Sequence, residues 1–390
     1  MKRVNNLYRQ ISMKDMLRLY QKQVKVNTKN KHKIYKFEEY FTANITNVYH
    51  LLHSDDYKVS DYNIFLIRDP KYRIIMSQKM NDKIINHVMA DYLIQVLDSC
   101  LIDTNVATRK NKGTHYGMRY FKKYLNELKG NTIYALKFDI SKYFYNIDHK
   151  ILKQMLQKKI KDKEYLNILF QIIDSTNENV NERIIKIKRK EIKKLEQSLM
   201  KDRYKRIKEI ENIPLYQYGK GLPIGNMTSQ IMAVFYLNDV DHYIKEQLHA
   251  KYYIRYMDDI IVLGNDKLFL KNIYNLIEIE LSKYDLSVNP KSNIYKLNNS
   301  FTFLGRTYYI KNDNVLYRCR SITYNGIIKK LNYLRNKDYK KYYLSKISYR
   351  GYLKKDIYSL KEEYIFLSSK YNNVIVKDFV NDYGYVIYSN

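Results

Sequence analysis

The sequence of 390 residues predicts an α+β fold, with helices covering one face of an antiparallel sheet. Hydrophobic residues make up 45% of the chain, which supports a sizeable packed core and excludes a disordered protein. Short runs of β-branched and aromatic residues alternate with longer segments of helical periodicity. Their order is βα, then αβ, then a ββ hairpin, then αβ, which favours the α+β class.

The N-terminal part is predicted to be helical, and a strand pair follows it. Residues 1–60 are polar, and their apolar residues have helical spacing, as in Met13, Met16, Leu17, Tyr20 and Val24. Residues 65–76 predict a strand, a turn at Asp69-Pro70 and a second strand. Residues 82–97 again show the periodicity of a buried helix.

The middle of the chain is predicted to contain a basic loop, a strand, and helices that include one highly charged stretch. Residues 109–115 form a basic, glycine-containing loop before a helix, residues 134–140 a strand and residues 149–160 a helix. Residues 181–210 are highly charged and helical, and their apolar residues form only a narrow stripe: Ile185, Ile192, Leu195 and Leu199. That stripe is typical of an exposed or paired helix, so we expect a surface insertion.

The C-terminal half contains the acidic hairpin. Residues 221–245 predict a glycine-marked loop and a helix, and residues 252–263 predict a hairpin. A helix is expected over residues 268–284 and a strand over 301–305. From about residue 320 the chain is basic, rich in tyrosine and helical.

The charge of the chain predicts a polyanionic partner. Lys and Arg number 70 against 40 Asp and Glu, a net charge of +30, which favours DNA or RNA. Codon bias towards Lys and Tyr does not explain why Lys outnumbers Glu. No apolar run is long enough to cross a membrane, and no membrane partner is expected. No apolar segment follows residues 1–6, and Cys100 and Cys319 lack metal-type spacing, so we expect a cytoplasmic protein with two reduced thiols.

Two acidic segments are the candidate catalytic centre. Asp258 and Asp259 lie at the tip of the predicted hairpin, and Asp139 follows an apolar strand where an acid has no packing purpose. Carboxylates suit hard divalent cations, and two Mg²⁺ ions can clamp the oxygens of a phosphoryl transfer, with Mn²⁺ as a substitute. We therefore predict Asp139, Asp258 and Asp259 as catalytic metal ligands. The alternative for the aspartate pair is an ordinary turn, which Asp also favours.

The motifs that surround these acids resemble those of reverse transcriptases. The resemblance covers residues 35–355 and rests on ordered segments: Pro70–Arg73, Asp139–Phe144, Gly221–Gln230, Tyr256–Asp259, Leu286–Lys291, Phe303–Gly305 and Ile347–Leu353. It implies a right-hand polymerase, with a helical N-terminal segment over 1–60 and fingers over 61–135. The palm would span 136–310, with a charged helical insertion at about 176–212, and the thumb and C-terminal tail 311–390.

The resemblance also implies roles for single residues around the incoming nucleotide. Phe144 matches the aromatic gate that excludes a 2′-hydroxyl, and the alternative is a core phenylalanine. Arg73 matches the fingers arginine that grips the triphosphate, a task that suits a guanidinium. Arg68 is either its partner or a surface residue. Lys291 matches a lysine that protonates the leaving pyrophosphate, or it is a solvated lysine.

The loop Gly221–Gln230 indicates which type of reverse transcriptase the chain resembles. Ile224 and Gln230 differ from the residues that many retroviral and intron enzymes have at these positions of the motif. In this respect the loop resembles that of bacterial diversity-generating and phage-defence reverse transcriptases. Ile224, Gly225 and Gln230 are predicted nucleotide-binding residues, with Gly225 allowing close approach of the backbone or making an ordinary turn. A helix cap at Thr228 or Ser229 is the alternative for this segment.

The basic loop is predicted to hold template or primer phosphates. Its residues are Arg109, Lys110, Lys112 and Gly113, and the alternative is a solvated charged loop.

These motifs predict an RNA-directed DNA polymerase in a bacterial retroelement or antiviral defence system. Expected partners are an RNA template, a DNA or RNA primer, dNTPs, a cognate non-coding RNA and an accessory protein. The alternatives are template-independent or protein-primed DNA synthesis, or a maturase-like RNA-binding protein. The presence of Asp139, Asp258 and Asp259 argues against the last of these.

Overall fold

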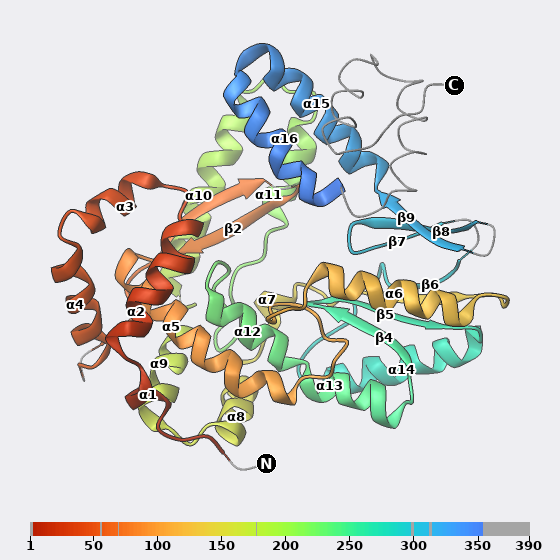
Figure 1. The fold of residues 1–390 in the computed structure, drawn as a ribbon, viewed down its shortest axis with the longest axis horizontal. Helices are drawn as coiled ribbons and strands as arrows, with labels where there is room; N and C mark the ends of the chain where they lie inside the picture. The colour runs from red at the N-terminus through yellow and green to blue at the C-terminus, as the bar shows by residue number, and fades with distance from the viewer. Residues whose placement is uncertain are drawn as a thin grey trace. The chain divides into compact units, whose positions relative to one another are not determined.

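The computed structural model describes residues 3–54, 57–68, 70–176, 178–297, 300–311 and 314–353 (Figure 1). Asp69 of the predicted turn and the predicted tail beyond residue 353 lie outside the described residues. The chain divides into two compact units, which are described separately. The larger contains Met1–Gly113, Lys137–Ile261 and Lys271–Asn293, and the smaller contains Thr114–Leu136, Val262–Leu270 and Ile294–Asn390.

The N-terminal segment is helical, as predicted, and packs around one long buried helix. Its elements are α1 (Leu7–Gln10), α2 (Met13–Leu19), the π-helix η1 (Tyr20–Lys25), α3 (Lys31–Glu38) and α4 (Phe41–Leu52). The long buried helix is α5 (Met80–Leu97), and the short 3₁₀ helix η2 (Asp98–Cys100) follows it. Met16, Tyr20 and Val24 are buried as expected, but Leu17 is exposed and Leu19 is buried instead. The reason is that α2 packs against both α4 and α5, which selects the face formed by residues 16, 19 and 20.

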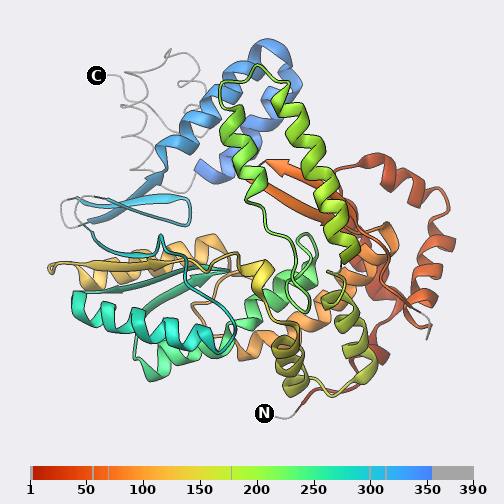
Figure 2. The same ribbon diagram turned by 180° about the vertical axis from the view of Figure 1, so that it is seen from behind.

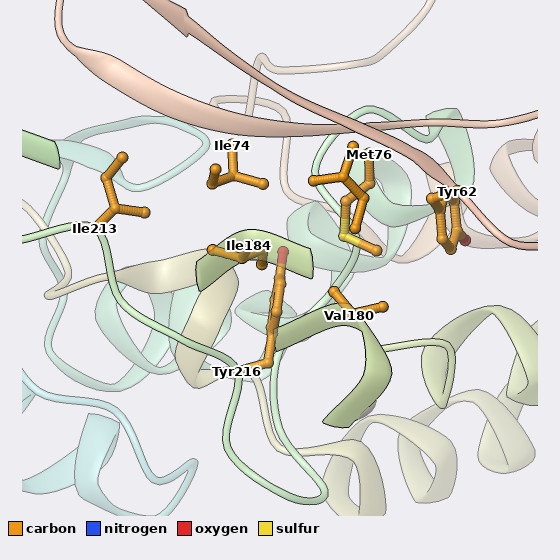
Figure 3. Close-up of a cluster of buried hydrophobic side chains, with 8 residues drawn as sticks. Tyr62, Ile74, Met76, Val180, Ile184, Ile213 and Tyr216 are labelled. Carbon is orange, nitrogen blue, oxygen red and sulfur yellow. The ribbon is translucent and has the colours of Figure 1, made fainter. Parts of the chain in front are cut away.

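The predicted strand pair is an antiparallel hairpin covered by the charged insertion. Strands β1 (Asn63–Arg68) and β2 (Tyr72–Ser77) pair with each other, and α10 (Glu178–Glu196) and α11 (Arg203–Glu211) pack against them (Figure 2). The shared apolar cluster comprises Tyr62, Ile64, Ile74, Met76, Val180, Ile184, Ile213 and Tyr216 (Figure 3). The insertion is therefore a paired helical hairpin that supplies the core of the strand pair.

The predicted apolar stripe of the insertion is partly wrong. The buried residues are Val180, Ile184 and Leu195, whereas Ile185 and Ile192 are half-buried and Leu199 is 97% exposed. The helix stops at Glu196, so Leu199 falls in the connection to α11 and has no strand beneath it.

A four-stranded sheet carries the acidic hairpin. Its order is β4 (Tyr252–Tyr256), β5 (Asp259–Gly264), β3 (Tyr134–Phe138) and β6 (Asn293–Lys296). The associated helices are α7 (Tyr143–Asn146), α8 (His149–Lys159), α9 (Lys163–Ile173), α12 (Met227–Tyr236), α13 (Asn238–His242), the π-helix η3 (Tyr243–Gln247) and α14 (Lys267–Ser282). Helix α12 packs against α5, α8 and α9, and almost all its residues are buried.

The smaller unit combines one helix, a three-stranded sheet and a helix pair. Its elements are α6 (Thr114–Leu128), β7 (Phe301–Phe303), β8 (Arg306–Lys311), β9 (Asn314–Cys319), α15 (Ser321–Lys337) and α16 (Tyr339–Leu353). The ring of Phe121 on α6 lies 5.0 Å from that of Phe303 and 4.5 Å from that of Tyr308, between ring centroids. The predicted basic helices are present, whereas the sequence reasoning did not identify β8 and β9.

No helix in the described part of the chain has both the length and the apolar character needed to cross a bilayer. The α+β class is confirmed by these elements. The division into N-terminal segment, fingers, palm and thumb stays a prediction.

Candidate active site

The sheet order brings two of the predicted acids together. Strand β3 ends at Phe138, so Asp139 follows directly, and Asp258 lies in the turn between β4 and the neighbouring strand β5. The carboxyl group of Asp139 is close enough to that of Asp258 to raise its pKa. Burial of Asp258, followed by the negative charge of Asp139, raises the Asp258 pKa to about 6. Two acids distant in the sequence thus form one electrostatic site.

The third acid, Asp259, has a basic neighbour that the sequence reasoning missed. Its Oδ1 atom lies 3.4 Å from Nζ of Lys137 on β3. Burial raises the pKa of Asp259 above its usual value, and the positive charge of Lys137 opposes that rise. The signal for Lys137 was a single lysine in an apolar strand, two residues before Asp139.

The donor chemistry of the acids fits a hard divalent cation. The raised pKa of Asp258 reflects burial first and the negative charge of Asp139 second, and a cation between the two carboxylates would remove the repulsion between them. Among the described residues, however, no three His, Cys, Asp or Glu side chains are gathered around a common metal position. The structure pairs Asp139 with Asp258 and leaves Asp259 beside Lys137, so the three-acid ligand set stays a prediction.

A turn that carries Lys291 is fixed to Asp139. The backbone N–H of Asn289 donates to the Asp139 carbonyl at 2.7 Å, and the Asp139 N–H donates to Oγ of Ser292 at 3.3 Å. Within the turn, the Lys291 N–H donates to Oδ1 of Asn289 at 3.1 Å. The exposed Lys291 side chain therefore belongs to a segment that is anchored at the end of β3.

A buried ion pair supports the hairpin turn, and the sequence reasoning missed it. Arg255 and Asp241 are both 0% exposed, with Nη2 of Arg255 2.6 Å from Oδ2 of Asp241. Asp241 also accepts hydrogen bonds from Tyr253 and Asn105. Burial lowers the Arg255 pKa, but the charge of Asp241 outweighs it and keeps the pKa above its usual value.

The same arginine holds the turn itself. Nη1 of Arg255 donates to the carbonyl of Met257 at 3.0 Å, and Met257 has a left-handed φ of 57°. A left-handed conformation costs a residue other than glycine about 1–3 kcal/mol unless its surroundings maintain it. Arg255 therefore fixes the strained residue next to Asp258. A charged residue in an apolar strand was the signal that could have identified it.

Arg73 and Arg68 have different surroundings on the strand pair. Arg73 is exposed on β2, and it alternates with Ile74, which is buried against the insertion. In the described part of the chain, no acidic side chain forms an ion pair with Arg73. Nη2 of Arg68 lies 3.6 Å from Asp202, and its Nε lies 3.8 Å from Glu209, so its partners are the N-cap residue of α11 and an acid on that helix.

Ile224 and Gly225 contact the strand pair through their backbones. The Met76 N–H donates to the Ile224 carbonyl at 2.8 Å. Gly225 has a φ of +132°, and a β-carbon there would lie 2.8 Å from the Met76 carbonyl oxygen. Glycine is therefore required for close approach to β2. The predicted approach of Gly225 to a base pair stays a prediction.

Replacing Gly225 with alanine is expected to destabilise the protein by about 1–3 kcal/mol, because the backbone conformation and the Met76 carbonyl both oppose a β-carbon. Urea unfolding would measure the change. Gly130→Ala is the matched control, since Gly130 has a φ of +91° but no atom within 4 Å of the added carbon. Equal losses in the two variants would show that the contact with Met76 is unimportant.

The N-terminus of α12 is capped from another helix. Oδ1 of Asn86 on α5 accepts hydrogen bonds from the N–H groups of Met227 at 3.0 Å and Thr228 at 3.2 Å. The predicted alternative, a cap at Thr228 or Ser229, is therefore wrong. Gln230 lies half-buried in the first turn of this helix.

Phe144 lies in the short helix α7 and is half-buried. Its carbonyl accepts a hydrogen bond from the Leu222 N–H at 2.8 Å, which ties it to the Gly221–Gln230 loop. Its ring meets that of the fully buried Tyr143 edge to face, with centroids 5.9 Å apart. Tyr143 thus packs in the core, and the gate role of Phe144 stays a prediction.

The basic loop is largely held by its own contacts. Arg109 is 5% exposed and donates to Asp98 Oδ1 at 2.5 Å and to the Ile102 carbonyl at 2.6 Å. Nζ of Lys112 lies 2.8 Å from Asp103. The guanidinium donors of Arg109 thus have a structural role inside the loop, and the predicted phosphate contact of Arg109 stays a prediction. Lys110 is exposed, and Gly113 has a φ of +106°.

A sheet with an acidic hairpin beside an acid at the end of the next strand is the arrangement of a polymerase palm. The family described as "Reverse transcriptase (RNA-dependent DNA polymerase)" matches residues 67–308. The chain belongs to this reverse transcriptase family, and the predicted right-hand polymerase fold and nucleotidyltransferase class are confirmed at that level.

Solved structures of yeast telomerases are similar to this chain. Apo telomerase from Candida tropicalis has a TM-score of 0.47 and 14% identity, covering 85% of this chain and 62% of that chain. The same enzyme truncated from its C-terminal domain has a TM-score of 0.42 and 16% identity, covering 66% of this chain and 55% of that chain. Telomerase from Candida albicans, in complex with a fragment of telomeric RNA, has a TM-score of 0.41 and 14% identity, covering 70% of this chain and 46% of that chain. This chain thus spans less than two thirds of these proteins. No curated protein matches it in sequence.

Proposed function

We propose that the protein is an RNA-directed DNA polymerase that adds dNTPs to a primer on an RNA template. The observation that carries the proposal is the pairing of Asp139 with Asp258 at the ends of the two central strands of the sheet, in a chain of the reverse transcriptase family. Asp258 is half-buried and carries a raised pKa beside the charge of Asp139, and such repulsion between two carboxylates is relieved by a cation. The net charge of +30 supports a nucleic-acid partner.

Asp139 and Asp258 would hold Mg²⁺, with Asp259 as a further ligand. Two bound ions would neutralise developing charge on the phosphates and acidify the primer 3′-hydroxyl. Asn289 keeps Asp139 in place through its hydrogen bond to the backbone, and Lys137 restrains Asp259. Exposed Arg73 would bind the triphosphate, and Lys291 would donate a proton to pyrophosphate. Ile224, Gly225 and Gln230 would line the nucleotide site, and Lys110 would contact the template.

The biological setting is proposed from the loop sequence. Ile224 and Gln230 support a bacterial retroelement or antiviral defence system, with a cognate non-coding RNA, an accessory protein and a cytoplasmic location.

The proposal is tested by primer extension with purified protein, Mg²⁺ and dNTPs on matched RNA and DNA templates. Extension on RNA supports it. Extension without any template would favour template-independent synthesis instead, and product that stays bound to protein after denaturation would favour protein priming. RNA binding without synthesis under any of these conditions would favour the maturase-like alternative.

Phe144→Ala is expected to admit ribonucleotides, because the half-buried ring would otherwise occupy the space of a 2′-hydroxyl. The measurement is the ratio of kcat/KM for dNTP and rNTP, with a shift of about 10-fold or more expected, since a lost steric contact is worth 1–3 kcal/mol. Tyr145→Ala is the control from the same short helix. An unchanged ratio in Phe144→Ala would refute the gate.

A further inference from the structure

A large cavity lies outside the catalytic residues, on the larger unit. It has a volume of about 1260 Å³ and lies between α8, the end of α9 and the loop at residues 216–219. Its lining contains none of the residues proposed to bind metal, nucleotide or template. The cavity therefore has no role in the proposed reaction.

One wall of the cavity is rigid because its polar groups are already bonded. His149 has Nδ1 3.2 Å from Asp174 Oδ1 and Nε2 2.7 Å from the Gly221 carbonyl. Nζ of Lys153 lies 2.6 Å from Asp174 Oδ2, and Thr176 donates to the Gly221 carbonyl at 3.0 Å. These contacts join three segments into a preformed surface.

A second group of lining side chains is exposed and unengaged. Within the described residues, none of these side chains makes a hydrogen bond or ion pair: Lys150, Gln154, Gln157, Asn179, Gln217 and Tyr218. Tyr218 is fully exposed on the loop. Amide, aromatic and ammonium groups thus face an open space without using their binding capacity.

The surface continues along α8 into a second hollow of about 590 Å³. Gln154 and Gln157 line both hollows, and Arg3 and Lys158 add two cations to the second. The acids of the first are already used, since Asp148 accepts from the Ile151 N–H at 2.8 Å and Asp174 is paired. The two hollows share Gln154 and Gln157 and together carry an excess of positive charge, and they are here called the α8 groove.

We propose that the α8 groove binds an unpaired segment of nucleic acid. Asn and Gln amides match the donor and acceptor edges of bases, an exposed tyrosine ring stacks on a base, and lysine and arginine neutralise phosphates. The cavity exceeds the ~300–1000 Å³ typical of small-molecule sites, which favours several linked nucleotides over a single one. Unpaired RNA and single-stranded DNA share this chemistry.

The test is binding of short fluorescein-labelled oligo(rA) and oligo(dA) to the full chain by anisotropy, without primer or dNTPs. Tyr218→Ala/Gln157→Ala is expected to raise Kd about 10-fold or more, the scale of one lost base stack. Lys150→Gln/Lys158→Gln is expected to reduce the slope of log Kd against log salt by about 1.4, since each phosphate contact on a single strand contributes about 0.7. Gln21→Ala/Tyr35→Ala, an exposed pair on the N-terminal helices, is the matched control.

Photocrosslinking of oligo(rA) that carries 4-thiouridine locates the bound strand. A crosslinked peptide from residues 148–158 or 216–219 supports the groove, and tighter binding of oligo(rA) than oligo(dA) identifies RNA as its ligand. Wild-type affinity in both groove variants, or equal competition by duplex RNA, overturns the proposal. Because no synthesis is measured, the outcome is independent of the proposed polymerase activity.

Discussion

Asp258→Asn is expected to reduce primer extension about a thousandfold or more while leaving RNA affinity unchanged. The substitution keeps the size of the side chain but removes the charge that would hold a divalent cation. Stabilisation of phosphoryl-transfer charge by such a cation is worth several kcal/mol, and each 1.4 kcal/mol is tenfold in rate. Single-turnover extension on an RNA template measures the loss, and Asp61→Asn, an exposed aspartate before β1, is the control.

The same variant should not be less stable than the wild type in metal-free buffer. Burial and Asp139 raise the folded-state pKa of Asp258 to about 6, above the value of about 4 in an unfolded chain. The folded state therefore binds more protons than the unfolded state between pH 4 and 6. As the pH rises through that window, the ionisation of Asp258 lowers the free energy of unfolding of the protein. Asparagine carries no charge at pH 7.5 and avoids that loss.

Thermal unfolding at pH 7.5 in the presence of a chelator distinguishes loss of metal binding from misfolding as the cause of lost activity. An inactive variant with an unchanged or higher Tm supports the metal role of Asp258. An inactive variant with a markedly lower Tm would mean that the activity was lost through misfolding, and normal extension would contradict the assignment of Asp258 altogether.

The sequence predicted what depends on local pattern. The apolar run of β3 and the hairpin around Asp258 follow from period-two and turn preferences, so the meeting of Asp139 and Asp258 could be foreseen once both strands were assumed to share a sheet. The helical N-terminus and the basic C-terminal helices follow from periodicity in the same way.

The sequence could not predict which partner a charged side chain takes. Arg109 belongs to a basic run that is typical of a phosphate-binding loop, yet its guanidinium binds Asp98 and Ile102 within the fold. Arg68, predicted as a partner of Arg73 or a surface residue, forms ion pairs with Asp202 and Glu209. These outcomes depend on tertiary contacts between distant segments, which composition and periodicity do not encode.

Contacts between backbone atoms of distant segments could not be predicted from the sequence either. Gly225 was expected to lie near a base pair or to form a turn, and its actual neighbour is the Met76 carbonyl on β2. The pairing of the Ile224 carbonyl with the Met76 N–H is the reason, since it draws two segments together without any side-chain signal. The charged insertion shows the same limit, because its face against β1 was shifted by one residue, from Ile185 to Ile184.

Asp241→Asn is expected to destabilise the protein by about 3–5 kcal/mol, because it leaves the Arg255 guanidinium charged and fully buried without its counter-ion. Urea unfolding measures the loss. Asp202→Asn, which weakens the surface ion pairs of Asp202 with Arg206 and Arg68, is the control and should cost far less stability, because water screens these charges.

The double variant Arg255→Met/Asp241→Leu separates the charge of the pair from its role at the turn. Removing both charges should recover much of the stability lost in Asp241→Asn, because no unpaired ion remains in the core. It also removes the donor that holds the Met257 carbonyl, so the strained turn before Asp258 loses its support. A folded double variant should therefore still show reduced kcat on RNA, with little change in RNA affinity. Full activity in that variant would show that Arg255 serves stability alone.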